Sequence, residues 1–176
     1  MRFHILKSST TKFLLISDSQ TQYLNYPNLN ILSIPGGKVC HARNFLPKKG
    51  AYDIIIIFIG GNDLFEKTTR AGIPVFSSVT PVQVANELIE LAEEALLLTK
   101  KVYVLAIPFR FDGAAAKKRV SAVNELLRER EQGYRYRGVS KRIYASHHLG
   151  SDDIHLSEQG LVGLRSILKN NILYEN

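Results

Sequence analysis

The sequence contains a single cysteine, Cys40, and no long apolar run. One cysteine excludes an internal disulfide, which is typical of a reducing compartment. No apolar segment approaches the roughly 20 residues that a membrane-spanning helix needs. The first ten residues, MRFHILKSST, lack the apolar centre and the small-residue cleavage site of a secretory signal. We therefore expect an intracellular, cytoplasmic protein.

Internal repeats, low-complexity segments and linkers are also missing from the 176 residues. This length suits one ordinary domain, and we expect residues 1–176 to form it. Hydrophobic residues make up 45% of the chain and charged residues 22%, which indicates a globular protein. Neither a second cysteine nor a spaced histidine cluster accompanies Cys40, so the sequence predicts no metal site, and we expect no cofactor.

Positive charge is concentrated in one part of the chain. The formal net charge is +7, and residues 117–142 hold nine basic side chains against three acidic ones, a net charge of +6. Such a run is usually a solvated surface, but the interleaved tyrosines Tyr134, Tyr136 and Tyr144 would also suit a phosphate backbone. The candidate nucleic-acid-binding residues are Lys117, Lys118, Arg119, Arg135, Arg137, Lys141 and Arg142.

Short apolar runs bounded by turn residues predict five strands. The third run, DIIIIFI, shows no alternation of apolar and polar residues. A strand that is apolar on both faces is typical of the middle of a parallel sheet covered by helices on both sides. The five predicted strands are Lys12–Ile16, Leu29–Ile34, Asp53–Ile59, Val102–Ile107 and Arg142–Ala145.

Amphipathic stretches alternate with these strands and predict helices. The clearest begins after Thr80, a plausible N-cap, with Pro81 in the first helical position and Gln83 completing a capping box. The alternation predicts a three-layer α/β sandwich, whose ligands bind at the carboxyl ends of the strands. The four predicted helices are Thr80–Thr99, Lys38–Leu46, Ala114–Arg130 and Ser157–Asn170.

Polar residues follow the ends of the predicted strands. The first strand ends in SDS (17–19), the second in PGG (35–37), the third in GGND (60–63), and the last leads into SDDIHLSEQG (151–160). Because the carboxyl ends of parallel strands share one edge, we expect four of these residues to converge there. They are Ser19, Gly36, Asn62 and His155.

Together these groups supply what acyl transfer requires. A serine hydroxyl such as that of Ser19 becomes a nucleophile when an imidazole takes its proton, and His155 can serve as that base. Asp152, three residues before His155, can orient the imidazole, whereas we expect Asp153 to point elsewhere. Backbone N–H groups of Ser19 and Gly36 and the side-chain amide of Asn62 are the predicted oxyanion donors.

These four blocks, in this order and at about this spacing, resemble those of the SGNH, or GDSL-type, hydrolases. The resemblance covers nearly the whole chain. It implies a flavodoxin-like α/β/α sandwich with strand order 2-1-3-4-5, no metal, and ester hydrolysis through an acyl-enzyme. It also implies that Ser19, Asp152 and His155 form the catalytic triad. Two departures stand beside the nucleophile, since the family usually has glycine where this chain has Ser17 and leucine where it has Gln20.

The sequence therefore predicts a serine esterase that removes a small acyl group from its substrate. The alternative is an RNA-associated module that keeps the fold with weak or no hydrolase activity and binds RNA through residues 117–142. Two branches of the family motivate this alternative by resemblance: the RNA-binding domain of Oskar and the esterase domains encoded by some retrotransposons. We expect segments 66–79 and 109–116 to determine specificity. We also expect Asp18 and Asp63 to satisfy backbone donors near the site.

Overall fold

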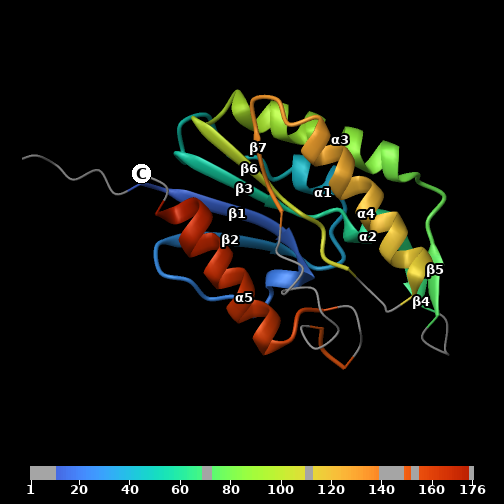
Figure 1. Cartoon of the computed structure of the whole chain (residues 1–176). Coiled ribbons are helices and arrows are strands. Elements are labelled where there is room, and N and C mark those ends of the chain that lie inside the picture. Colours follow the sequence, from blue (N-terminus) through green and yellow to red (C-terminus); the bar gives the residue numbers. More distant parts are fainter. Residues whose placement is uncertain (1–10, 69–72, 110–112, 139–148, 152–154, 175–176) are drawn as a thin grey trace, which may run out of the picture.

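The computed structural model describes residues 11–68, 73–109, 113–138, 149–151 and 155–174. Five parallel strands form its main sheet in the order β2-β1-β3-β6-β7 (Figure 1). Counted along the chain within this sheet alone, the order is 2-1-3-4-5, which confirms the prediction. The strands are β1 (Phe13–Asp18), β2 (Leu29–Ile34), β3 (Ile54–Phe58), β6 (Lys101–Leu105) and β7 (Arg135–Arg137).

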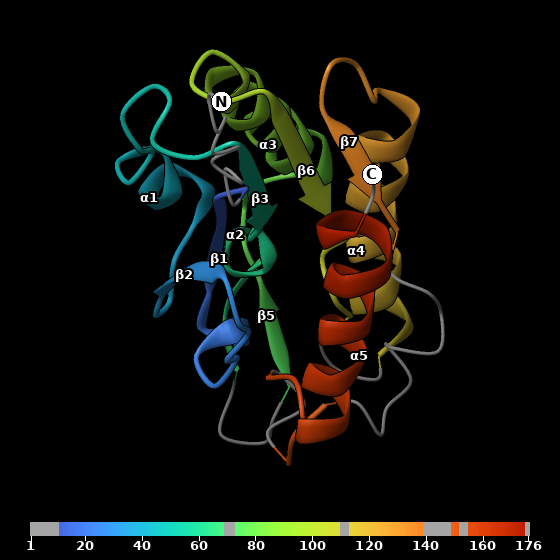
Figure 2. The ribbon, with the colours of Figure 1, turned by 90° about the vertical axis from the view of Figure 1, so that its left-hand side faces the viewer.

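Helices cover both faces of the sheet and give the predicted three layers (Figure 1 and Figure 2). One face packs against α1 (Val39–Arg43), α3 (Pro81–Leu96) and α4 (Ala114–Glu129). The other face packs against α5 (Glu158–Leu168), which continues into a π-helical turn, Lys169–Leu173. No helix in the described ranges is long and apolar enough to cross a membrane.

Strand β3 is the centre of the core. All five of its side chains are buried. Ile55 and Ile57 belong to the core beneath α3 and α4, whereas Ile56 and Phe58 belong to the core beneath α5. This packing on both faces explains why the IIIIF run lacks alternation.

Helix α3 begins as the sequence predicts. The Gln83 N–H donates to Thr80 Oγ1 at 3.2 Å, and the Thr80 N–H donates to Gln83 Oε1 at 2.8 Å. This capping box satisfies two backbone donors, and Pro81 follows directly. The helix ends at Leu96, a few residues earlier than predicted.

The fifth strand of the described sheet is Arg135–Arg137, which the sequence did not predict, since it predicted a last strand at Arg142–Ala145. Residues 142–145 lie outside the described part of the chain. The side chains of this strand point to opposite faces of the sheet in turn. Tyr136 packs toward the core under α3 and α4. Arg135 and Arg137 lie on the other face, with their guanidinium groups 5.9 and 5.1 Å from the centroid of the Tyr103 ring. Alternation of this kind suits a half-exposed edge strand.

An antiparallel hairpin, which the sequence did not predict, interrupts the parallel fold. It follows the short helix α2 (Gly61–Leu64) and consists of β4 (Phe65–Thr68) and β5 (Pro74–Phe76). The Arg119 guanidinium of α4 donates to the backbone oxygens of Leu64 at 3.3 Å and Ser77 at 2.7 Å, and also to that of Val79. It lies 5.6 Å from the centroid of the Phe76 ring. Arg119 therefore fastens the hairpin to α4.

Replacing Arg119 tests this attachment. We expect Arg119→Met to lower the free energy of unfolding by on the order of 2 kcal/mol, because carbonyl groups would lose a charged donor. Lys118→Met is the matched control, since Lys118 is the exposed neighbour on the same helix and should change stability by less than about 0.5 kcal/mol. Denaturant unfolding measures both, and equal effects would contradict the attachment.

Candidate active site

The Ser19 turn begins where β1 ends. Asp18 caps a 3₁₀ turn, Ser19–Thr21, because its Oδ1 accepts from the Gln20 N–H at 3.0 Å. The neighbouring strand fixes the same point, since Ser33 Oγ donates to the Asp18 backbone oxygen at 2.9 Å. Ser19 is half-buried at the carboxyl end of β1, as the sequence predicts.

Ser17, the residue that replaces the usual glycine of the resemblance, is fully buried at the end of β1. Its hydroxyl has no hydrogen-bond partner within the described residues. A buried hydroxyl without a partner costs free energy. The end of β1 therefore accommodates the added bulk of Ser17, at the cost of a buried hydroxyl.

His155 meets Ser19 across the fold. His155 Nε2 lies 2.8 Å from Ser19 Oγ, although 136 residues separate them in the chain. His155 precedes α5, whose N-cap Ser157 accepts from the Gly160 N–H at 3.2 Å. Leu161 and Leu164 of α5 pack on the sheet beside β1. A hydroxyl and an imidazole nitrogen at this distance form the pair needed for nucleophilic activation.

The Gly36 turn follows β2. The Gly37 N–H donates to the Ile34 backbone oxygen at 2.8 Å, Pro35 occupies the second position, and Gly36 has φ +64°. This is the pattern of a type II turn, which requires a positive φ at its third position. The closing hydrogen bond uses the N–H of Gly37 rather than that of Gly36. A Cβ on Gly36 would meet no atom of the described residues within 4 Å, which leaves room among them for a ligand to approach its backbone.

Asn62 joins the turns after β1, β2 and β3. It lies in α2, and its Nδ2 donates to the Gly37 backbone oxygen at 2.9 Å and lies 3.5 Å from Asp18 Oδ2. The contact with Asp18 is at the outer limit of a hydrogen bond. Of the two contacts, the one with Asp18 is therefore the weaker, and Asn62 Nδ2 could give it up more easily in order to donate to an oxyanion.

Asp63, the residue after Asn62, binds the start of α1. Its two carboxylate oxygens lie 3.3 and 3.2 Å from the Val39 backbone nitrogen, which donates to them at the first residue of α1. Burial raises the pKa of the Asp63 carboxyl to about 6, against the lowering effect of this hydrogen bond. Asp18 and Asp63 thus bind backbone donors, and this prediction is confirmed.

Gln20 has a role that the sequence did not predict. Its side-chain Oε1 accepts from the Leu156 N–H at 2.9 Å, and the whole residue is buried. On the same segment, the Gly150 N–H donates to the His155 backbone oxygen at 2.7 Å, and Leu149 pairs with Leu156. The glutamine that stands after Ser19, where the family of the resemblance usually has leucine, was visible in the sequence, but its distant partner Leu156 was not.

Asp152, the predicted partner of His155, lies outside the described residues, as does Asp153. Its role remains a prediction. Among the described residues, no group of three or more His, Cys, Asp or Glu could hold a metal ion. An open groove of about 610 Å³ lies elsewhere, along α3 and the end of α4, with Glu90, Glu129 and Glu131 in its walls. Neither Ser19 nor His155 lines it.

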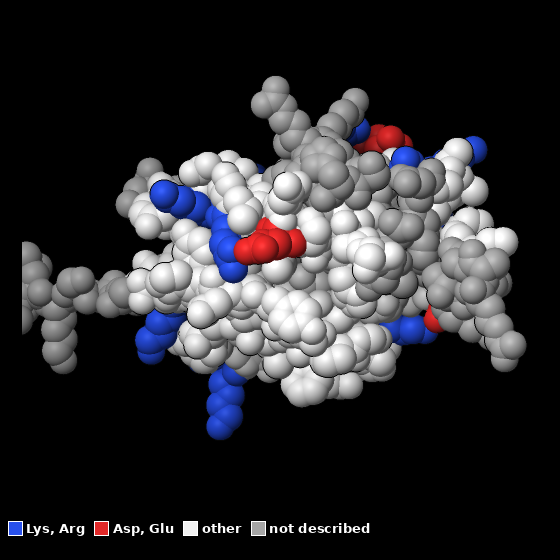
Figure 3. All heavy atoms as spheres, turned by 90° about the horizontal axis from the view of Figure 1, so that it is seen from below, with Lys and Arg blue, Asp and Glu red and all other residues white. Residues whose placement is uncertain are grey.

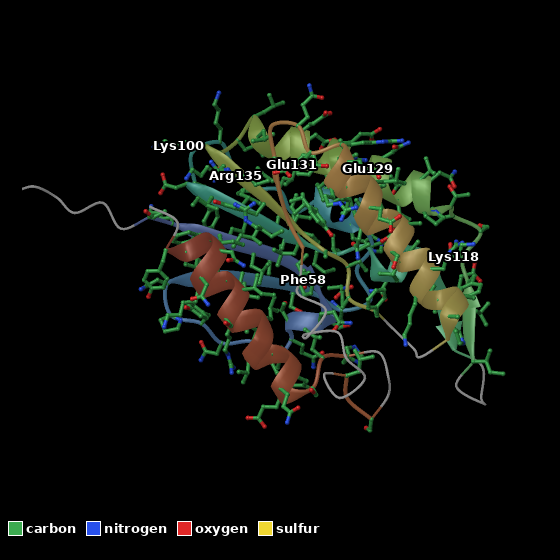
Figure 4. All side chains as sticks on the ribbon, in the orientation of Figure 1. Phe58, Lys100, Lys118, Glu129, Glu131 and Arg135 are labelled. Atoms are coloured by element: carbon green, nitrogen blue, oxygen red, sulfur yellow. The ribbon has the colours of Figure 1, made fainter. Side chains whose placement is uncertain are left out.

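The basic residues of segment 117–142 do not form one surface in the described part of the chain. Arg119 holds the hairpin, and Lys118 and Arg135 lie at widely separated places (Figure 4). Lys117 is exposed on α4, Arg137 covers Tyr103, and Lys141 and Arg142 lie outside the described residues. Seen from the side on which α5 lies, the described residues show only scattered Lys, Arg, Asp and Glu side chains (Figure 3). RNA binding stays a prediction without support from these positions.

No protein-family model matches the sequence, and no curated protein matches it. Solved structures do match the fold. A lipase/acylhydrolase from Enterococcus faecalis is 18% identical, with 89% of this chain and 95% of that chain covered and a TM-score of 0.63. A member of the lipolytic protein G-D-S-L family from Veillonella parvula is 15% identical, with 93% and 99% covered and a TM-score of 0.71.

A third similar structure is a catalytic mutant of an acetylxylan esterase from Geobacillus stearothermophilus. It is 16% identical, with 90% of this chain and 93% of that chain covered and a TM-score of 0.69. At these identities the likeness concerns the fold. The chain has the fold of the G-D-S-L acylhydrolases, which confirms in its architecture the resemblance seen in the sequence.

The raised pKa of Asp63 predicts a pH dependence of stability. Because folding raises this pKa from 3.8 to about 6, the folded state holds the proton more tightly, and the contribution of Asp63 to stability falls as pH rises from about 4 to about 6. Wild type should therefore lose on the order of 2 kcal/mol relative to Asp63→Asn between pH 4 and pH 7. Denaturant unfolding of both proteins measures this difference, and parallel pH profiles would contradict it.

Proposed function

We propose that the protein is a serine hydrolase that cleaves carboxylic esters with a small acyl group. The observation that carries the proposal is the 2.8 Å contact between His155 Nε2 and Ser19 Oγ at the carboxyl edge of the sheet. Its setting supports the same reaction, because the side chain of Asn62 contacts both Asp18, the residue before Ser19, and Gly37, the residue after Gly36. The similar folds of the acylhydrolases add support.

In the first half of the reaction, His155 Nε2 takes the proton of Ser19 Oγ, and Oγ attacks the carbonyl carbon of the ester. The tetrahedral intermediate collapses when the C–O bond to the leaving group breaks. The imidazolium of His155 returns its proton to this oxygen, and an alcohol departs. The acyl group is then bonded to Ser19.

In the second half, His155 takes a proton from water, and the resulting hydroxide attacks the acyl carbon. The bond between Ser19 Oγ and the acyl carbon breaks, the proton passes to Oγ, and the carboxylic acid leaves. The net reaction consumes one ester and one water. It releases one alcohol and one acid.

Three donors stabilise the oxyanion of both intermediates in this proposal. They are the backbone N–H groups of Ser19 and Gly36 and the side-chain amide of Asn62. The type II turn supports the assignment of Gly36, because the N–H of Gly37 makes the hydrogen bond that closes the turn, and the N–H of Gly36 is not needed for it. Donors held in place before the reaction stabilise developing charge without reorganisation.

Asp152 orients the imidazole in this proposal. It would accept from the second ring nitrogen of His155, which fixes the tautomer and stabilises the imidazolium. The support is the spacing, since Asp152 stands three residues before His155.

The acyl group is proposed to be small. Acetyl esters are the natural first substrates to try, because the acetylxylan esterase of Geobacillus stearothermophilus, also described as an acetyl-xylooligosaccharide esterase, is among the proteins with similar folds. The identity of the leaving group is expected to depend on segments 66–79 and 109–116, which follow the carboxyl ends of β3 and β6.

Removing the nucleophile tests the proposal. Wild type should hydrolyse p-nitrophenyl acetate, and Ser19→Ala and His155→Ala should each lower kcat by about 10³-fold or more, because the pair acts as a unit. Ser166→Ala, an exposed serine of α5, should leave turnover unchanged. Release of p-nitrophenol measures the rates, and equal turnover by Ser19→Ala and wild type would refute the assignment.

Asn62→Ala tests the oxyanion site. We expect kcat to fall on the order of 10²- to 10³-fold with little change in KM, because the lost donor acts in the transition state. Asn30→Ala is a control, since the Asn30 amide also donates to a backbone oxygen, that of Phe13 at 3.4 Å, at the other end of β1. A change confined to KM would assign Asn62 to substrate binding instead.

A further inference from the structure

We propose that Gln20 is a positioning residue for the catalytic base. Its side chain would hold the segment that carries His155 in the register that places the imidazole against Ser19. This inference rests on the proposed function, because it assigns His155 the role of base.

Two adjacent contacts link the same two segments. Ser19 Oγ meets His155 Nε2 at 2.8 Å, and the next residue of each segment makes the second contact, since the Leu156 N–H donates to Gln20 Oε1 at 2.9 Å. The first contact must change during the reaction, as the proton moves. The second involves no reacting atom and persists throughout.

Gln20 is itself fixed at its backbone. Its N–H donates to Asp18 Oδ1 at 3.0 Å, and Asp18 terminates β1, a central strand of the sheet. The hydrogen bonds therefore run from the sheet through Asp18 and Gln20 to Leu156. The residue is only 4% exposed, which restricts the side chain to few conformations.

The His155 segment needs such an anchor. Within the described residues, its backbone contacts with Gly150 and Leu149 lie inside the region 149–156 and do not reach β1. Helix α5 begins after it, at Glu158, and Leu156 packs in the core beneath that helix, so the Gln20 contact adds a polar link from this segment to the end of β1. A displacement of about 1 Å between nucleophile and base is enough to slow a reaction about 100-fold.

Glutamine provides the acceptor at this buried position, which a leucine would lack. The bond to the Leu156 N–H is buried, so removal of Gln20 Oε1 takes away the acceptor of a buried donor. A buried donor without a partner is unfavourable, and the segment would shift to find another acceptor.

The test compares two substitutions of Gln20. Gln20→Met keeps the length and removes the acceptor, so kcat for p-nitrophenyl acetate should fall about 10- to 100-fold while KM changes less than about threefold. Gln20→Glu keeps an acceptor oxygen. On a logarithmic scale, its kcat should therefore lie at least about halfway from that of Gln20→Met to that of wild type. Hydrogen exchange at the Leu156 amide should accelerate in Gln20→Met and stay slow in Gln20→Glu.

Thr99→Val is the matched control for lost stability. Thr99 Oγ1 donates to the Tyr52 backbone oxygen at 2.9 Å near the amino ends of β3 and β6, opposite the site. Its removal should lower the melting temperature and leave kcat unchanged. Both Gln20 variants are measured well below their melting temperatures, so that unfolding does not enter the rates.

Three results would overturn the inference: wild-type kcat in Gln20→Met, a Gln20→Glu variant as slow as Gln20→Met, or an equal loss of kcat in Thr99→Val. A wild-type protein that hydrolyses no ester is a different failure, because it refutes the proposed function. Hydrogen exchange at Leu156 requires no substrate. It would then still show whether Gln20 holds the segment.

Discussion

Burial of β3 on both faces is the constraint on which the site depends. Helices must cover each face of such a strand, and the crossovers that place them there make neighbouring strands parallel. Parallel strands end at one edge, so the turns after β1, β2 and β3 lie together. Ser19 and His155 can therefore form a hydrogen bond although 136 residues separate them in the chain.

The turns at this edge are held by polar groups that bind backbone atoms. Asn62 binds the turn after β2, Asp63 binds the start of α1, and Asp18 caps the Ser19 turn. Some of these arrangements lower stability, since burial raises the pKa of Asp63 and the Ser17 hydroxyl lacks a partner within the described residues. Proteins commonly accept such costs at functional sites.

The sequence predicted the central strands and the approach of Ser19 and His155 to each other, because both follow from local patterns. An apolar run without alternation indicates a central strand, and turn residues after it mark the edge where ligands bind. The edge strand β7 was missed because its alternation depends on packing of Arg135 and Arg137 over Tyr103. Likewise, contacts of Arg119 and Gln20 join residues distant in the chain, and no local pattern reveals them.

The most direct test of the account is the site of covalent modification by a fluorophosphonate, located by mass spectrometry of proteolytic peptides. If Ser19 is the nucleophile, the phosphonyl group will be found on Ser19, and His155→Ala will slow the labelling by about 10²-fold or more. Labelling at another serine, or labelling of Ser19 at the same rate without His155, would contradict the account.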